Sequence, residues 1–312
     1  PEDKRYGQDI LIPKNATAQA EADQVAAVEL TEPPSLHSQP VGRITEVLGE
    51  IDDPGMEIEI AVRKYEVPHR FSPETLAQTG KLPDRVRAAD MKQRINLTDV
   101  PLVTIDGEDA RDFDDAVFAR KLPNGMTRLF VAVADVAHYV RTGTAMDREA
   151  YERGTSVYFP HRVLPMLPER LSNGICSLNP NEDRLVLVCE MEFDPTGRKT
   201  RHRVYEAVFR SHHRCVYETL QQFFDRPSDT GHEYAPKVRE SLEILFDLYK
   251  KQHQARIRRG AIDLNLPEAK VKVNRETGEV DAIVRTERLD THRLIEEFMI
   301  ADRKSTRLNS SH

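Results

Sequence analysis

A run of acidic residues between two apolar segments restricts the fold of this chain more than any other feature. Six carboxylates fall within residues 106–115. The apolar segment 102–105 precedes the run, and a second apolar segment, 116–119, follows it directly. A purely solvated acidic loop is one interpretation. However, if both flanking segments are buried strands, the loop stays near a core with its like charges crowded at a strand end, and something must offset their repulsion.

A divalent cation is the partner that such a carboxylate cluster favours. Oxygen-only ligands suit magnesium, or manganese in its place, at sites that are shared with substrate phosphates. A calcium-binding EF-hand loop does not fit, because counting from Asp106 places Ala110 at the fifth position and Arg111 at the sixth. Those positions require an oxygen ligand and a glycine. Magnesium held by several carboxylates suits two-metal phosphodiester hydrolysis, and the sequence therefore predicts metal-assisted phosphoryl chemistry.

The remaining sequence predicts an α+β fold that begins with a small β-barrel. Residues 1–78 contain short strand patterns, among them 24–30, 41–49 and 57–63, the last with a polar–apolar period of two. Strands of this length and spacing are typical of an OB-fold, although an SH3-like barrel has the same spacing. Residues 79–100 are expected to form a helical connector.

Residues 101–301 predict a second domain of mixed α/β type. The near-continuous apolar segment 129–134 is typical of a strand that is buried on both faces. A hairpin is expected over 185–209, and long helices over 237–258 and 289–300. Residues 302–312 lose all apolar periodicity, which indicates either a disordered terminus or foreign sequence fused at a truncation point.

Composition limits the classes of protein without naming a function. The net charge of −7 gives no bulk support for nucleic-acid binding. The basic stretches 198–203 and 250–259 offer local positive charge, or are simply solvated faces. No apolar run approaches the roughly 20 residues that cross a bilayer, so no membrane partner is expected.

The cysteines and the first residue of the chain lead to further expectations. Three irregularly spaced cysteines predict buried reduced thiols without a disulfide partner, as in a cytoplasmic protein. The first residue is Pro, so we expect a piece of a longer chain, with a monomer as the expected state.

Residues 103–116, VTIDGEDARDFDDA, closely resemble the signature of the RNase II family of exoribonucleases. Residues 1–78 are similar to the family's second cold-shock (OB) domain, and residues 101–301 are similar to the N-terminal part of its catalytic RNB domain. Further similar blocks lie at 42–49, 170–178, 259–263 and 292–297. The resemblance therefore covers most of the chain.

The resemblance implies an activity and a set of site residues. The family hydrolyses single-stranded RNA processively from the 3′ end and releases nucleoside 5′-monophosphates, with magnesium as the cofactor. Its signature aspartates fall on four positions, which are Asp106, Asp112, Asp114 and Asp115. Asp114, beside Asp115, is expected to be indispensable to the chemistry. An RNA-stacking aromatic falls on Tyr158, which without the family would be taken for a half-buried core tyrosine.

Two other functions stay open. The family's phosphate-contacting arginine and its C-terminal RNA-binding domain have no counterpart in this sequence. A non-catalytic RNA-binding module, built from the barrel and the basic stretches, is therefore the alternative. A weaker one takes Asp106 and Glu108 as the D-x-E motif of a different two-metal exonuclease fold, but that motif is common by chance. The spacing of the four aspartates favours the exoribonuclease.

Overall fold

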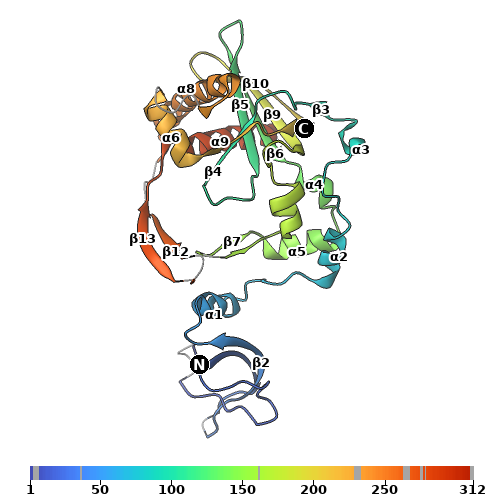
Figure 1. The fold of residues 1–312 in the computed structure, drawn as a ribbon, viewed down its shortest axis with the longest axis vertical. Coiled ribbons are helices and arrows are strands. Elements are labelled where there is room, and N and C mark those ends of the chain that lie inside the picture. Colours follow the sequence, from blue (N-terminus) through green and yellow to red (C-terminus); the bar gives the residue numbers. More distant parts are fainter. Residues whose placement is uncertain are drawn as a thin grey trace. The chain divides into compact units, whose positions relative to one another are not determined.

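The computed structural model describes residues 1–2, 7–35, 37–160, 162–227, 233–262, 268–274, 277 and 279–309 (Figure 1). The chain forms two compact units. The first comprises Pro1–Arg70, Val157–Leu164 and Lys270–Val284, and the second comprises Phe71–Ser156, Pro165–Ala269 and Arg285–His312. Among the helices of the described residues, none is both long enough and apolar enough to cross a membrane.

Among its described residues, the first unit contains one helix and all or most of three small two-stranded sheets. The pairing of β1 with β2 is antiparallel and begins at Gln24 opposite Glu50, which confirms the strands predicted over 24–30 and 41–49. The elements are β1 (Gln24–Glu32), β2 (Val41–Glu50), α1 (Met56–Lys64), β7 (Val157–Tyr158), β8 (Val163–Leu164), β12 (Glu268–Val273) and β13 (Val280–Thr286).

The strand predicted over residues 57–63 is wrong, because this segment forms α1. Gly55 precedes the helix with φ 85°, a turn conformation that glycine adopts without strain. Glutamates lie in the first turn and basic residues in the last, which complements the helix dipole. Met56 and Val62 are its buried side chains. End charges and burial on one face therefore outweigh the alternating pattern.

A seven-stranded sheet in the order β11-β4-β5-β6-β9-β10-β3 forms the centre of the second unit. Neighbouring strands are antiparallel except at the two ends, where β11 pairs with β4 and β3 pairs with β10 in parallel. The strands are β3 (Ile95–Asn96), β4 (Val103–Asp106), β5 (Asp115–Lys121), β6 (Thr127–Ala134), β9 (Asp183–Phe193), β10 (Lys199–Arg210) and β11 (His213–Val216).

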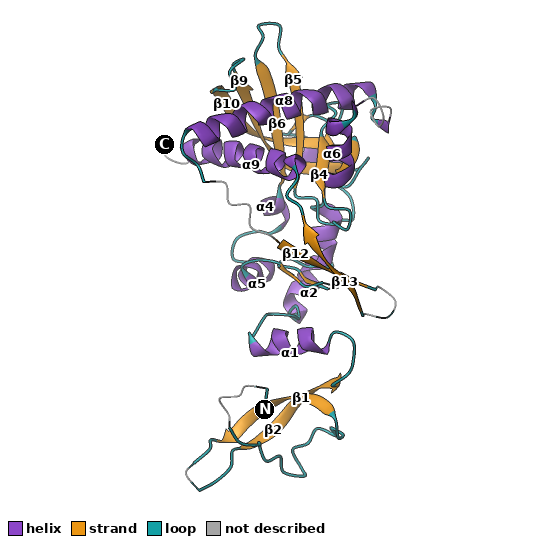
Figure 2. Cartoon of the chain, turned by 90° about the vertical axis from the view of Figure 1, so that its left-hand side faces the viewer, coloured by secondary structure: helices purple, strands orange, loops and turns teal. Residues whose placement is uncertain are grey.

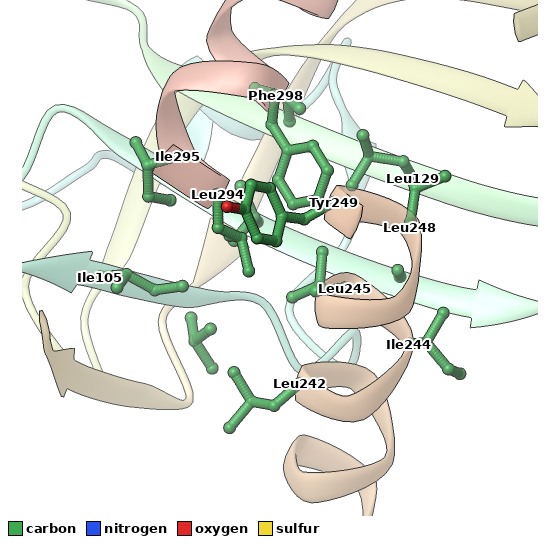
Figure 3. Close-up of a cluster of buried hydrophobic side chains, with 14 of the residues drawn as sticks. Ile105, Leu129, Leu242, Ile244, Leu245, Leu248, Tyr249, Leu294, Ile295 and Phe298 are labelled. Carbon is green, nitrogen blue, oxygen red and sulfur yellow. The ribbon is translucent and has the colours of Figure 1, made fainter. Parts of the chain in front are cut away.

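Both faces of this sheet are buried. Side chains of a strand alternate between faces, so Leu129 and Val131 join one core, whereas Phe130 and Ala132 join the other. The uniformly apolar sequence of β6 follows from this arrangement. Helices α6 (Tyr217–Asp225), α8 (Pro236–Arg258) and α9 (Asp290–Asn309) supply the first core (Figures 2 and 3). Shorter helices supply the second: α3 (Ala88–Met91), α4 (Val136–Tyr139), α5 (Ala145–Arg153) and the π-helical turn η1 (Arg170–Ile175).

Two boundaries differ from expectation. The segment 79–100 is not wholly helical, because it contains β3, which joins the sheet beside β10.

The last helix does not end at Ile300 but continues to Asn309. Ser305 is fully buried in it and donates a hydrogen bond to the Ala301 carbonyl at 2.7 Å. Residues 302–309 are thus helical and not disordered, while 310–312 lie outside the described residues, as does Asp263 of the block 259–263.

Candidate metal centre

The acidic loop joins two neighbouring strands of the sheet. Asp106 is the last residue of β4 and Asp115 is the first of β5, so the loop connects two adjacent strands at the same end of the sheet. On its other side β4 pairs with β11, which places Asp106 opposite Val216. Asp112 and Asp114 lie within the loop. The fold therefore brings the four predicted aspartates to one sheet end, as the sequence indicated.

Hydrogen bonds hold the second half of the loop in place. Phe113 is buried, and its N–H donates to the Ser177 hydroxyl at 3.1 Å. The Phe113 carbonyl accepts a hydrogen bond from the Leu178 N–H at 2.9 Å. The Asp114 carbonyl accepts one from the N–H of Ala134 on β6, also at 2.9 Å. The main chain beside Asp112 and Asp114 is thus fixed to two other segments.

Burial and neighbouring charges raise the pKa values of Asp106, Asp114 and Asp115. Burial is the largest cause for Asp106 and raises its pKa to about 6, with further contributions from the charges of Asp114 and Asp112. Burial also raises the pKa of Asp115 to about 7, helped by the charges of Asp106 and Asp114. The pKa of Asp114 is raised by burial and by Asp112. Arg214 opposes the effect at Asp106. Like charges are therefore crowded at this sheet end, where Asp106, Asp112 and Asp115 are half-buried and Asp114 is exposed.

This donor set fits an oxygen-preferring divalent cation. Carboxylates are the ligands that magnesium and manganese favour, and a cation would offset the repulsion that the raised pKa values report. Within the described residues, no three His, Cys, Asp or Glu side chains converge tightly enough to form a complete cation site. The chemistry of the ligands is in place, and a cation would have to draw the side chains together.

Two residues near the cluster were not expected from the sequence. Tyr217 at the start of α6 is close enough to Asp106 and Asp115 that their charges, after burial, raise its pKa. Its ring stacks on that of His292 with 4.1 Å between ring centroids. Tyr217 directly follows β11, and it comes near the aspartates because β11 pairs with β4. No local sequence pattern predicts that pairing.

Tyr158 belongs to the other compact unit. It lies on β7, opposite Val163 of β8, and 65% of its surface is exposed. This exposure excludes the half-buried core tyrosine that the residue type alone suggests. The three cysteines, Cys176, Cys189 and Cys215, are buried with free thiols.

A comparison with protein families decides the assignment. The model of the RNB domain matches residues 94–306. The chain belongs to the RNB family. The model of a cold shock domain matches residues 1–72, ahead of the RNB domain. The resemblance to the RNase II family and the α+β fold of a cold-shock-like region followed by an RNB domain are thereby confirmed.

Known relatives of this RNB-family chain carry one recurring name. Ribonuclease R of Escherichia coli is 47% identical over 300 residues, which cover 96% of this chain and 37% of the relative. The structure of Mycoplasma genitalium RNase R in complex with ribose methylated single-stranded RNA matches with a TM-score of 0.88 at 29% identity. That match covers 95% of this chain and 46% of the other.

A more distant structure shares the fold alone. Yeast Ssd1, described as a pseudonuclease, matches with a TM-score of 0.67 at 20% identity over 93% of this chain and 36% of the other. At this identity the likeness shows the fold alone, and a fold does not by itself imply a function.

Proposed function

We propose that this chain contains the metal-binding centre of a processive 3′→5′ exoribonuclease, which hydrolyses single-stranded RNA and releases nucleoside 5′-monophosphates. The observation that carries the proposal is the crowded cluster of four signature aspartates at one sheet end of an RNB-family chain. The names of the curated relatives and the RNA in the Mycoplasma structure support the same substrate. Because the chain spans about a third to a half of these proteins, the activity of the whole enzyme is part of the proposal.

The residues that would hold magnesium, or manganese in its place, are the four aspartates of the cluster. When bound, the ions supply an activated water and offset the charge on the phosphoryl and leaving oxygens. The water oxygen forms the new bond to phosphorus while the bond to the 3′ oxygen breaks, so the phosphate leaves on the 5′ side of the released nucleoside. Hydrolysis with this polarity yields nucleoside 5′-monophosphates.

The chain's own residues contribute position and charge. The Asp114 carbonyl accepts a hydrogen bond from the Ala134 N–H of β6, so the main chain that carries this carboxylate is fixed to the sheet. Asp115 continues directly into β5 and is fixed by that strand. We assign the catalytic carboxylates to these two residues. Tyr158 offers an exposed ring on which a base can stack whatever its sequence.

Two further expectations stay predictions. A cytoplasmic location is proposed, with which the free buried thiols agree. A monomer is proposed as the functional state.

The test is degradation of a single-stranded RNA that carries a 5′ label, in magnesium and in excess EDTA. The proposal predicts shortening from the 3′ end with release of nucleoside 5′-monophosphates, abolished by EDTA, while a circular RNA of the same sequence stays intact. Cleavage of the circle, or cleavage in EDTA, would contradict it.

The alternative is a non-catalytic RNA-binding protein. Yeast Ssd1, described as a pseudonuclease, has a similar fold and is the reason to test this alternative. Binding of the linear RNA by a folded chain, without cleavage in either metal, would favour this alternative.

A further inference from the structure

We propose that Ser177 and Arg214 are positioning residues, which fix the backbone of the acidic loop so that its aspartates can converge on a divalent cation. The inference rests on the proposed function, because it concerns the same site. Neither residue is one of the proposed ligands. Each contacts main-chain atoms next to proposed ligands.

Ser177 holds the second half of the loop with two hydrogen bonds. Its hydroxyl accepts from the Phe113 N–H at 3.1 Å and donates to the Arg111 carbonyl at 2.8 Å. These two peptide groups flank Asp112, and Phe113 also precedes Asp114. Ser177 is 1% exposed, so bulk water does not compete for these two hydrogen bonds. Loss of the hydroxyl would leave a buried N–H without a partner and release both groups.

Ser177 is itself held rigidly. The guanidinium of Arg184, which is almost fully buried, donates from Nε to the Ser177 carbonyl at 2.6 Å. The same guanidinium donates to the Gly174 carbonyl at 3.2 Å. Leu178, the next residue, donates its N–H to the Phe113 carbonyl. The turn that carries the hydroxyl therefore has a single position relative to the loop.

Arg214 holds the first half of the loop. From β11 its guanidinium donates to the Gly107 carbonyl at 3.1 Å and also to the Glu108 carbonyl. The same group lies over the Phe113 ring, with 5.2 Å from Cζ to the ring centroid. Its Nε is buried without a hydrogen-bond partner among the described residues. A buried N–H without a partner costs free energy. The other contacts of Arg214, which are to the loop, must offset this cost.

Together the two residues support the main chain beside three proposed ligands. Arg214 contacts the Gly107 and Glu108 carbonyls, which follow Asp106, and Ser177 contacts the peptides on either side of Asp112. Leu178, next to Ser177, contacts the carbonyl that precedes Asp114. Without such support the like charges would spread the loop apart. The fold thus fixes the backbone of the loop before the cation arrives, so less ordering of the loop opposes cation binding.

Manganese binding to the whole chain tests the proposal, with free Mn²⁺ measured by electron paramagnetic resonance. Ser177→Ala removes the hydroxyl. Arg214→Lys keeps the charge but loses the planar fork that reaches two carbonyls. Groups that orient metal ligands typically change affinity by about 10–100-fold when they are lost. We expect each variant to weaken Mn²⁺ binding at least about tenfold, and to speed amide hydrogen exchange over residues 107–113.

Two matched controls separate positioning from general stability. Ser241 is equally buried and accepts the Ala119 N–H at 3.0 Å, away from the loop. Arg153 lies 3.8 Å over the Phe71 ring and donates to the Pro165 carbonyl at 3.4 Å. Ser241→Ala and Arg153→Lys therefore remove the same kinds of contact elsewhere. Both should keep the affinity for Mn²⁺ and the exchange rate of the loop.

Unchanged Mn²⁺ affinity in both site variants would overturn the inference, and so would an equal loss in the controls. If the parent chain binds no Mn²⁺, the proposed function fails, and the exchange measurement then decides the inference by itself. Unchanged exchange over 107–113 in Ser177→Ala and Arg214→Lys would overturn it in that case too.

Discussion

At the scale of single residues, the acidic cluster is a source of instability. Asp115 and Asp106 have pKa values raised to about 7 and about 6, mainly by burial and then by their acidic neighbours. A group whose folded pKa is raised binds protons on folding, so near neutral pH the folded state must hold charges that the unfolded chain would leave in water. The chain thus gives up stability at the place where it is proposed to bind metal.

The metal-free chain should accordingly lose stability as the pH rises. The folded chain binds extra protons between the ordinary carboxyl pKa of about 4 and the raised value of about 7. In EDTA, the thermal midpoint should fall between about pH 5 and about pH 7.5. Because one pKa unit corresponds to about 1.4 kcal/mol, Asp115 contributes an effect on the order of a few kcal/mol.

Asp115→Asn is the comparison that isolates this effect. The variant should be more stable than the parent at about pH 7.5, with a flatter pH dependence. A scanning-calorimetry series on both proteins checks this. If the variant has a lower thermal midpoint than the parent at every pH, the folded state does not disfavour the ionised form of Asp115.

Tyr158 should contribute to RNA affinity and little to folding. Stacking of a base on an aromatic ring is worth about 1–3 kcal/mol, so Tyr158→Ala should weaken single-stranded RNA binding by roughly 5–150-fold. Because 65% of the residue is exposed, the thermal midpoint should hardly change. Fluorescence anisotropy with a labelled oligonucleotide measures the affinity. Tyr151, 89% exposed on α5, provides the matched Tyr→Ala control. Equal losses in both variants would show that any exposed tyrosine has this effect.

At the scale of elements, the sequence predicts those whose signal is local. The apolar run of β6 and the long helix α8, which ends before Gly260 at φ 83°, are where the pattern places them. The residues 57–63 were mispredicted as a strand, because their alternation is as strong as the charge pattern that makes them a helix. The aspartates could be found because all four lie within ten residues of sequence.

The supporting residues could not be found in this way. Arg214 reaches the loop because β11 pairs with β4, which is more than a hundred residues earlier in the chain. Ser177 reaches Phe113 from the turn after η1, through a contact between segments 64 residues apart. Neither residue has a local pattern that marks it, since a serine or an arginine acquires its partner only from the tertiary structure.

An ion-pair network ties the hairpin of Tyr158 to α1 within the first unit. Arg162 lies in the turn between β7 and β8 and pairs with Glu59 of α1, which also pairs with Arg63. Arg63 in turn pairs with Glu46 on β2 at 3.0 Å. The helix that replaced the expected strand therefore connects the hairpin to the sheet of β1 and β2.

Removing the central charge of this network should loosen the hairpin. Glu59→Gln is expected to speed amide exchange over residues 157–164, and to weaken RNA binding less than Tyr158→Ala does. The loss of stability should stay below about 1 kcal/mol, because the pairs are partly exposed. Glu57→Gln, the same change of charge on the same helix, is the control. Identical exchange in the two variants would mean that the network does not hold the hairpin.

At the scale of the whole molecule, the proposed roles are divided between the two units. The four aspartates and the residues that support their loop belong to the second unit, and Tyr158 belongs to the first. Binding and chemistry should therefore be separable by mutation. The family and the fold of both parts are established by the comparisons, whereas the activity depends on whether the aspartates act as proposed.

The most direct measurement compares the parent chain with Asp114→Asn on one single-stranded RNA, with affinity and magnesium-dependent cleavage rate determined on the same preparations. We predict an RNA dissociation constant within a factor of about three of the parent's. Cleavage should be slower by on the order of 10²-fold or more, as when a preorganised electrostatic group is lost from an active site. Equal cleavage rates in the two proteins would contradict the assignment of the acidic cluster as the catalytic centre.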